Sequence, residues 1–157
     1  IKEYITSITS TIPKEFRSSQ VVGIGGTIRS LSSVIMNKER YPINSLHGFE
    51  YRVKDYRSLI KEIPSMDDKA LKKLDFPTNR LDTIKEGVSI FYRVLKELDA
   101  EYVIASKAGV REGVYLSDLL RNSNHTFDKN FNVSIKSLMD RYALNEKNCA
   151  YVQRVSK

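Results

Sequence analysis

The sequence predicts an α/β fold that is rich in helices. Short apolar runs typical of strands occur at residues 20–24 and 101–106, a long stretch with helical spacing lies between them, and no two strand-like runs are joined by a tight hairpin. Strands that alternate with helices favour the α/β class. Two or three strands make a small sheet, so we expect that strands completing it are missing from this chain.

The first helix and the first strand are expected near the start of the chain. Apolar residues recur at helical spacing over residues 1–12, and Pro13 ends that pattern. Residues 20–24 are short, β-branched and apolar, as in a buried strand. A glycine pair follows, and helical spacing resumes at Thr27. The unit is therefore a strand, a glycine turn and a helix.

Shorter elements are expected in the middle of the chain. Residues 49–53 alternate between apolar and polar side chains and predict a short strand. Asp55 is expected to cap a helix that Pro64 ends. Asp67 and Asp68 open another short helix, and for this pair we favour a helix cap over a metal site.

The clearest helix runs from Arg80 to Leu98, because its apolar residues follow one another in steps of three and four. The second strand-like run comes directly after it. Residues 107–113 then turn the chain and lead into a helix that reaches Leu120.

The end of the chain predicts a separate group of helices. Residues 121–132 are polar and show no periodicity, so we place a domain boundary there. Beyond it, residues 135–142 form one helical face, and Asn145 is expected to cap a last helix.

Composition indicates a globular protein with an anionic partner. The chain has 157 residues, of which 41% are hydrophobic and 29% are charged, and this balance is ordinary for a folded domain. Its net charge of +7 favours polyphosphate, nucleotides, nucleic acid or acidic lipid. Most of the basic side chains are nevertheless expected on solvated helix faces.

The cysteine count and the N-terminus bear on location. Cys149 is the single cysteine, so no internal disulfide and no cysteine metal site can form, and we expect a cytoplasmic setting. No apolar run is long enough for a transmembrane helix, and residues 1–4 do not resemble a secretory signal. The lack of an initiator Met is expected of a fragment or a processed product.

The strongest candidate site is the glycine turn. A phosphate placed after a strand and against a helix N-terminus meets free backbone N–H groups and the positive end of the helix dipole. Gly25 and Gly26 would let it approach, and the Thr27 hydroxyl could bond it or cap the helix. The alternative is a tight turn with an ordinary N-cap, and the motif by itself does not decide between the two.

Two arginines are further candidates. Arg111 lies after the second strand-like run, where ligands of open α/β sheets gather, and could grip phosphate with its fork. Its alternative is a structural ion pair with a helix carboxylate. Arg80 lies at a helix start, where a cation often has an anion to meet, and its alternative is an ion pair with Asp82.

The remaining polar residues point to no further chemistry. His47 and His125 have no partner at metal-ligand spacing, so we expect both to be structural. No Ser-His-Asp set and no carboxylate pair suited to acid/base catalysis is found. The sequence alone therefore predicts no catalytic residue and no metal ligand.

Four short motifs occur in order. Residues 22–31 contain Gly-Ile-Gly-Gly-Thr, residues 46–49 read Leu-His-Gly-Phe, residues 77–87 read Pro-x-x-Arg-x-Asp-x-Ile-x-x-Gly, and residues 106–113 read Ser-x-x-Gly-Val-Arg-Glu-Gly. Together they resemble the second lobe of the exopolyphosphatase/guanosine-pentaphosphate phosphatase family, which has Leu at the place of Val110. Any one motif alone would be weak.

The resemblance implies a partial lobe of the actin-like, ribonuclease H-like ATPase superfold, helix-rich and followed by C-terminal helices. Residues 1–121 would be the second lobe of the phosphatase core, incomplete at its N-terminus. Residues 122–157 would be a linker and the first helices of a truncated helical domain. The implied activity is release of terminal phosphate from polyphosphate or guanosine pentaphosphate, with magnesium, in the stringent response.

Carried over by position, Gly25, Gly26 and Thr27 would contact phosphate, with Arg80 and Arg111 as further phosphate-binding candidates. The family's opening Asp-x-Gly-Ser loop, its water-activating glutamate and its Asp-x-Gly-Gly-Gly-Ser loop do not occur here. Magnesium would therefore be bound mainly by the missing lobe. We expect the chain alone to bind phosphate weakly and to hydrolyse nothing.

Three other functions compete with this one. A non-catalytic phosphate or guanosine-polyphosphate binding module fits nearly as well. A nucleic-acid binder ranks lower, because the tyrosines mostly occupy apolar helical positions, and a sugar or acetate kinase fits residues 106–113 less well. We expect no membrane partner. An open sheet edge would favour a homodimer, which size-exclusion chromatography would test.

Overall fold

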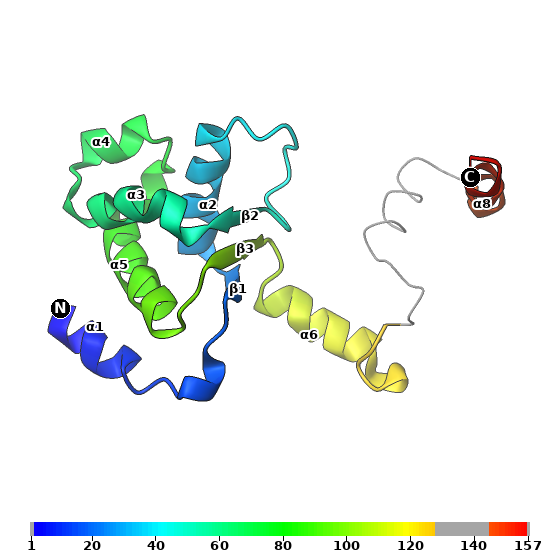
Figure 1. The fold of residues 1–157 in the computed structure, drawn as a ribbon, viewed down its shortest axis with the longest axis horizontal. Helices are drawn as coiled ribbons and strands as arrows, with labels where there is room; N and C mark the ends of the chain where they lie inside the picture. The colour runs from blue at the N-terminus through cyan, green and yellow to red at the C-terminus, as the bar shows by residue number, and fades with distance from the viewer. Residues whose placement is uncertain (1, 128–144, 157) are drawn as a thin grey trace. The chain divides into compact units, whose positions relative to one another are not determined.

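A computed structural model describes residues 2–127 and 145–156 of the chain (Figure 1). Its contacts divide the chain into two units, residues 1–112 and 113–157, which are described separately. The helical face expected at residues 135–142 lies outside the described residues. The expected lobe boundary at residues 121–122 concerns a larger assembly and stays a prediction.

The first unit is built on a three-stranded sheet with strand order β1-β3-β2. β1 (Gln20–Ile24) pairs in parallel with β3 (Tyr102–Ser106), so that Ile24 lies beside Ser106 at the ends of both strands. β2 (Glu50–Arg52) runs antiparallel on the other side of β3. A small mixed sheet among many helices confirms the helix-rich α/β class.

β1 is more exposed than the sequence predicts. Val22 is 61% exposed and Ile24 is 56% exposed, while only Gly23 in this strand is buried. The prediction of a buried strand is wrong because β1 lies at the edge of the sheet, next to an apolar groove of about 550 Å³ between β1 and α5. An apolar run identifies a strand but does not reveal what covers it.

The first unit contains five α-helices among the described residues, joined by short 3₁₀ turns. They are α1 (Lys2–Thr9), α2 (Gly26–Lys38), α3 (Arg57–Glu62), α4 (Asp68–Lys73) and α5 (Leu81–Glu97). The 3₁₀ turns span Lys14–Phe16, Val53–Tyr56, Ile63–Ser65 and Thr78–Arg80. Within the described part of the chain, no helix is both long and apolar enough to cross a membrane.

Three further elements of the described residues lie at or beyond the unit boundary. α6 (Val110–Leu119) crosses it, the 3₁₀ turn Arg121–Ser123 follows, and α8 (Glu146–Val155) begins after Asn145. The Asn145 Oδ1 atom accepts from the amides of Lys147 at 2.9 Å and Asn148 at 3.3 Å, which confirms the expected cap.

Two expected caps in the middle of the chain have different outcomes. Asp67 caps α4, because its Oδ1 accepts from the Ala70 amide at 2.7 Å. Asp55 does not cap α3: it lies inside the 3₁₀ turn Val53–Tyr56, and Tyr56 takes the N-cap position without a side-chain bond. Asp55 therefore lies one residue before the N-cap of α3.

The core is formed where α2 and α5 pack on the sheet and on each other. Leu31 and Ile35 of α2 are fully buried, as is Val88 of α5. The Phe49 ring packs between Tyr41 and Tyr51, with ring centroids 5.0 and 5.9 Å apart. The packing of α2 against β1 and β3 holds the glycine turn beside the strand ends.

Gly87 allows α5 to approach α2 closely. A Cβ atom at Gly87 would come within 2.5 Å of the Thr27 Oγ1 and 3.2 Å of the Thr27 Cβ. We expect Gly87→Ala to lower the free energy of unfolding by about 1–2 kcal/mol, because overpacking costs more than the higher helix propensity of alanine gains. Urea denaturation of the variant measures this.

Gly113→Ala is the matched control for this substitution. Gly113 also lies inside a helix, but a Cβ there would meet nothing within 4 Å. Alanine at this position should stabilise α6 by up to about 1 kcal/mol, because alanine has the higher helix propensity. If both variants stabilise the protein equally, the close packing of α2 and α5 is not what requires glycine at Gly87.

Candidate anion-binding site

The candidate site lies where β1 and β3 end. The two strands are parallel, so the glycine turn after Ile24 and the loop after Ser106 leave the same edge of the sheet. In open α/β sheets this edge, at the carboxyl ends of the strands, is where ligands bind. The structure therefore brings together two segments that are more than eighty residues apart in the sequence.

Gly25 has a backbone conformation that other residues avoid. It is the N-cap of α2 with φ 114° and ψ 171°, a region populated almost only by glycine. No side chain caps this helix end. The amides of the first turn of α2, beginning at Gly26, have no acceptor within the helix. They are free to donate to an anion.

Thr27 is not the N-cap of α2, which corrects one of its two expected roles. The helix already begins at Gly26, and the half-buried Thr27 side chain packs against Gly87 of α5. Its backbone amide still belongs to the first turn. An anion at this turn would therefore meet the Thr27 amide, while the side chain holds α2 against α5.

Arg80 covers the glycine turn. A Cβ atom at Gly26 would lie 2.6 Å from one terminal nitrogen of the Arg80 guanidinium and 2.7 Å from its carbon, so the cation rests on the Gly26 backbone. The Arg80 side chain is exposed, and among the described residues it forms no ion pair, not even with Asp82. The alternative of an Arg80–Asp82 pair is wrong.

Arg29 is a residue of this site that the sequence did not single out. Its Nε donates to the Gly25 carbonyl at 3.3 Å, and its Nη1 donates to the Lys107 carbonyl at 3.5 Å. It therefore links the glycine turn to the loop after β3. Its place one helical turn after Gly25 was a signal that could have identified it.

His47 supports the same loop from the other side. Its Nδ1 accepts from the Lys107 amide at 3.3 Å, in agreement with the structural role expected for this histidine. The neighbouring Gly48 amide donates to the Ala105 carbonyl at 2.9 Å. With the contacts of Arg80, Arg29 and Thr27, these bonds join all four sequence motifs at one edge of the sheet.

Arg111 lies in the first turn of α6, which begins at Val110 and thus inside the segment expected to be a turn. Its side chain is exposed and, within the described residues, forms no ion pair, so the structural ion pair offered as its alternative is not observed. No contact brings it to Gly26. Of the two candidate arginines, the structure places only Arg80 on the glycine turn.

Glu112 closes the start of α6. Its Oε2 accepts from the Gly109 amide at 2.7 Å. Hydrogen bonds from its own amide and from that of Gly109 hold the pKa of Glu112 below the usual value, and the charges of Arg111 and Arg29 add to this. This cap stabilises the first turn of α6.

The hydrogen bond between the Glu112 carboxylate and the Gly109 amide should depend on pH. Because the pKa of Glu112 is lowered in the folded state, the stabilisation is present above the ordinary glutamate pKa and is lost as the pH falls through the lowered pKa. We expect the amide resonance of Gly109 to shift in that acidic range, followed by NMR. Glu112→Gln should abolish the shift. A Gly109 transition at the ordinary glutamate pKa would contradict the prediction.

A hollow of about 310 Å³ opens beside the site. Arg29 and Lys107 line it together with polar side chains of α2 and with Asn44, and Asp75 is its one carboxylate. Within the described residues, no group of three His, Cys, Asp or Glu side chains could hold a metal ion. The described residues of the site therefore offer backbone donors and positive charge but no metal centre.

Comparison with known proteins gives one family. The Ppx/GppA phosphatase family profile matches residues 1–122. No curated protein sequence matches the chain significantly.

Two crystal structures are similar to the chain. One is of the Aquifex aeolicus member of the Ppx/GppA protein family, with a TM-score of 0.63, 25% sequence identity, and coverage of 77% of this chain and 40% of that one. The other is the type II variant of the Aquifex aeolicus Ppx/GppA phosphatase, with a TM-score of 0.62, 25% identity, and coverage of 76% and 40%. The chain thus spans about 40% of the length of these proteins.

Proposed function

The chain belongs to the Ppx/GppA phosphatase family, and from this premise we propose that it forms part of a phosphatase acting on inorganic polyphosphate, guanosine pentaphosphate or both. Within that enzyme this chain would bind phosphate. The contacting residues would be Gly25, Gly26, Thr27 and Arg80. Arg111 remains a weaker candidate, since no contact links it to the glycine turn.

The contact between Arg80 and Gly26 carries this proposal. It sets a guanidinium, free of any described carboxylate, beside the unpaired amides of a helix N-terminus. Both groups attract an anion, and a phosphoryl group can accept from several donors at once. Donors that are already in place before the substrate arrives stabilise charge at little cost in reorganisation.

Within the described residues, no group of three His, Cys, Asp or Glu side chains could hold a magnesium ion. We propose that the nucleophile and any magnesium ion are held by parts of the enzyme outside this chain. Residues 1–121 would be an incomplete second lobe of an actin-like core, and residues 122–157 would lead into a helical domain. The exposed edge of β1 fits a sheet that is completed elsewhere or across a homodimer. A cytoplasmic location fits these substrates.

Activity of the whole natural protein tests the proposal. We expect it to release phosphate from polyphosphate or guanosine pentaphosphate in the presence of magnesium, while the 157-residue chain alone binds tripolyphosphate without hydrolysing it. Phosphate release can be followed by a colorimetric assay and binding by calorimetry. Full activity of the 157-residue chain, or no activity in the whole protein, would overturn the proposal.

A non-catalytic binding module is the second candidate. It is favoured by the same site, which has cations and amides but, among the described residues, no metal-binding cluster. If the whole protein binds guanosine polyphosphates without turnover, this second function replaces the first. If it releases phosphate, the binding module is excluded.

A further inference from the structure

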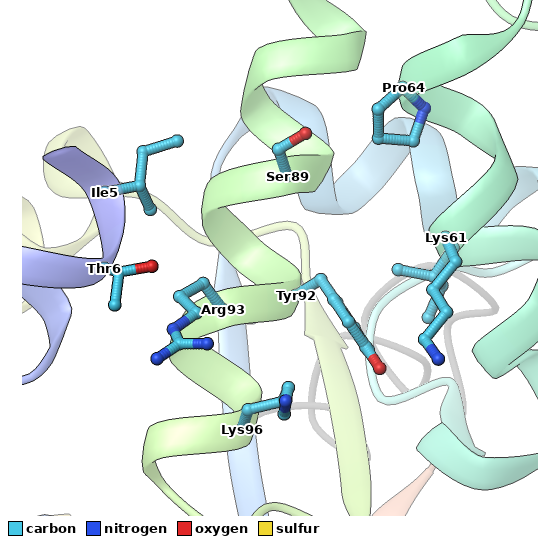
Figure 2. Close-up of a pocket in the computed structure, with 9 residues that line it drawn as sticks. Ile5, Thr6, Lys61, Pro64, Ser89, Tyr92, Arg93 and Lys96 are labelled. Atoms are coloured by element: carbon cyan, nitrogen blue, oxygen red, sulfur yellow. The ribbon is translucent and has the colours of Figure 1, made fainter. Parts of the chain in front are cut away.

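Another hollow lies on the face of α5 that is turned toward α1 and α3. It has a volume of about 310 Å³, with α5 as its floor, α1 as one wall, and α3 with the following 3₁₀ turn as the other (Figure 2). The figure shows Ile5 and Thr6 on one side of α5 and Lys61 and Pro64 on the other. We call this hollow the α5 groove.

Three cationic side chains line the α5 groove, and one of them, Arg93, is paired with Glu97. Lys61 of α3 and Arg93 and Lys96 of α5 are among its nine lining residues, none of which is acidic. Lys61 and Lys96 are exposed, and among the described residues neither forms an ion pair. A ligand with negative charge would meet cations from two helices.

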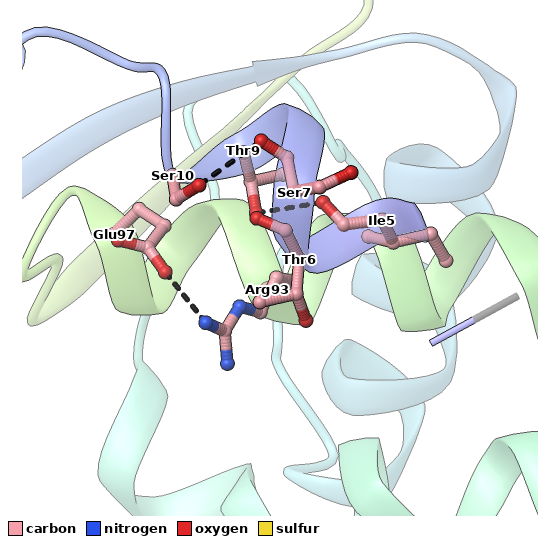
Figure 3. A network of polar contacts seen from close by, with 7 residues as sticks. All are labelled: Ile5, Thr6, Ser7, Thr9, Ser10, Arg93 and Glu97. Carbon is pink, nitrogen blue, oxygen red and sulfur yellow. Dashed lines mark hydrogen bonds and ion pairs between the residues drawn. The ribbon is translucent and has the colours of Figure 1, made fainter. Parts of the chain in front are cut away.

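Arg93 is held in place by its own helix. Its Nη2 donates to the Glu97 Oε1 at 2.9 Å, and Figure 3 shows this ion pair on α5 beside Thr6 of α1. Its Nε is buried and, within the described residues, has no acceptor. Because the Nε atom is shielded from solvent, a ligand in the groove would meet the rest of the Arg93 guanidinium and not this nitrogen.

The rest of the groove is suited to a ring. Ile5, Ile60 and Pro64 contribute apolar surface, and the partly buried Tyr92 offers an aromatic face between the two walls. The Ser89 hydroxyl already donates to the Lys85 carbonyl at 2.9 Å, so it can only accept from a ligand. Small-molecule sites combine such apolar lining with a few convergent polar groups.

The α5 groove is separate from the glycine turn. Arg80 stands at the start of α5 and Lys96 sixteen residues further on, which is about 24 Å along a helix. None of the residues that line the groove belongs to the glycine turn or to the loop after β3. One phosphate group cannot occupy both places.

We propose that the α5 groove binds a nucleoside monophosphate, with the phosphate among Lys61, Arg93 and Lys96 and the base against Tyr92. Its volume of about 310 Å³ lies at the lower end of the range for small-ligand sites, which suits a mononucleotide rather than a larger molecule. Occupation would tie α1 and α3 to α5. The ligand would act on the protein from outside the candidate phosphatase site.

Calorimetric titration of the whole natural protein with AMP tests the proposal. We expect AMP to bind, and the double variant Lys61→Gln/Lys96→Gln to weaken binding at least about tenfold, because charge-assisted hydrogen bonds are lost. Both lysines are exposed, so the double variant should fold, which thermal denaturation checks. Lys54→Gln, at an exposed lysine outside the groove, is the matched control and should leave affinity unchanged.

Two further titrations show whether AMP binds in the α5 groove or at the glycine turn. Gly26→Val, which disturbs the glycine turn, should leave AMP affinity unchanged, whereas inorganic phosphate should bind the groove far more weakly than AMP. Loss of AMP binding in Gly26→Val with no effect of the double lysine variant would overturn the proposal in favour of the glycine turn. Absence of AMP binding, or equal affinity of the Gly26→Val variant for phosphate and AMP, would also overturn it.

Discussion

Replacing Arg80 with glutamine is expected to weaken tripolyphosphate binding by about ten- to a hundredfold, because a charged hydrogen bond contributes roughly 1.5–3 kcal/mol. The guanidinium rests on Gly26 and, among the described residues, serves no ion pair, so its loss should leave the fold intact. Arg80→Lys keeps the charge but not the fork and should lose less. Isothermal titration calorimetry measures all three proteins.

Arg40→Gln is the matched control. Arg40 follows the C-terminal end of α2, about 20 Å from the glycine turn along a helix of 13 residues. The same charge is removed from the protein, so a general effect of net charge would weaken binding equally in both variants. Equal affinities of Arg80→Gln and Arg40→Gln would exclude Arg80 as a phosphate contact.

Replacing Gly25 with alanine is expected to cost both stability and binding. Its φ of 114° imposes a backbone strain of about 1–3 kcal/mol on any other residue, while the new Cβ would meet nothing within 4 Å. The strain is relieved by shifting the turn, which moves the first amides of α2 away from the anion. Urea denaturation and titration with tripolyphosphate measure the two effects.

Gly48→Ala separates strain from binding. Gly48 also has a positive φ, 84°, and open space around its Cβ position, but it lies after the His47 turn and not on α2. We expect a similar loss of stability with tripolyphosphate affinity retained. If Gly48→Ala weakens binding as much as Gly25→Ala does, the effect of Gly25 is general destabilisation.

Local pattern was enough to predict most elements of the fold. β1 has the bounds expected from its β-branched run, and α5 differs from the expected helix Arg80–Leu98 by one residue at each end. The family resemblance drawn from four motifs is confirmed by the profile match over residues 1–122. Such features depend on neighbours in the sequence, which a single sequence displays directly.

Contacts between distant segments could not be predicted in this way. The site depends on Arg80 reaching Gly26, 54 positions earlier, and on Arg29 reaching Lys107. Both follow from how α2 and α5 pack, and Gly87, the last residue of the third motif, lies at that packing contact. β1 was expected to be buried and Asp55 was expected to cap α3. Both predictions are wrong for the same reason, since burial and capping depend on what surrounds the segment.

The double hydrogen bond of Arg29 has an entropic consequence. By holding the Gly25 carbonyl and the Lys107 carbonyl together, it removes the freedom of the two loops to move independently when the protein folds. An anion then finds the loops already ordered and binds with little further loss of conformational entropy. Arg29→Met would transfer that loss to the binding step, so that part of the fall in affinity comes from a less favourable entropy of binding.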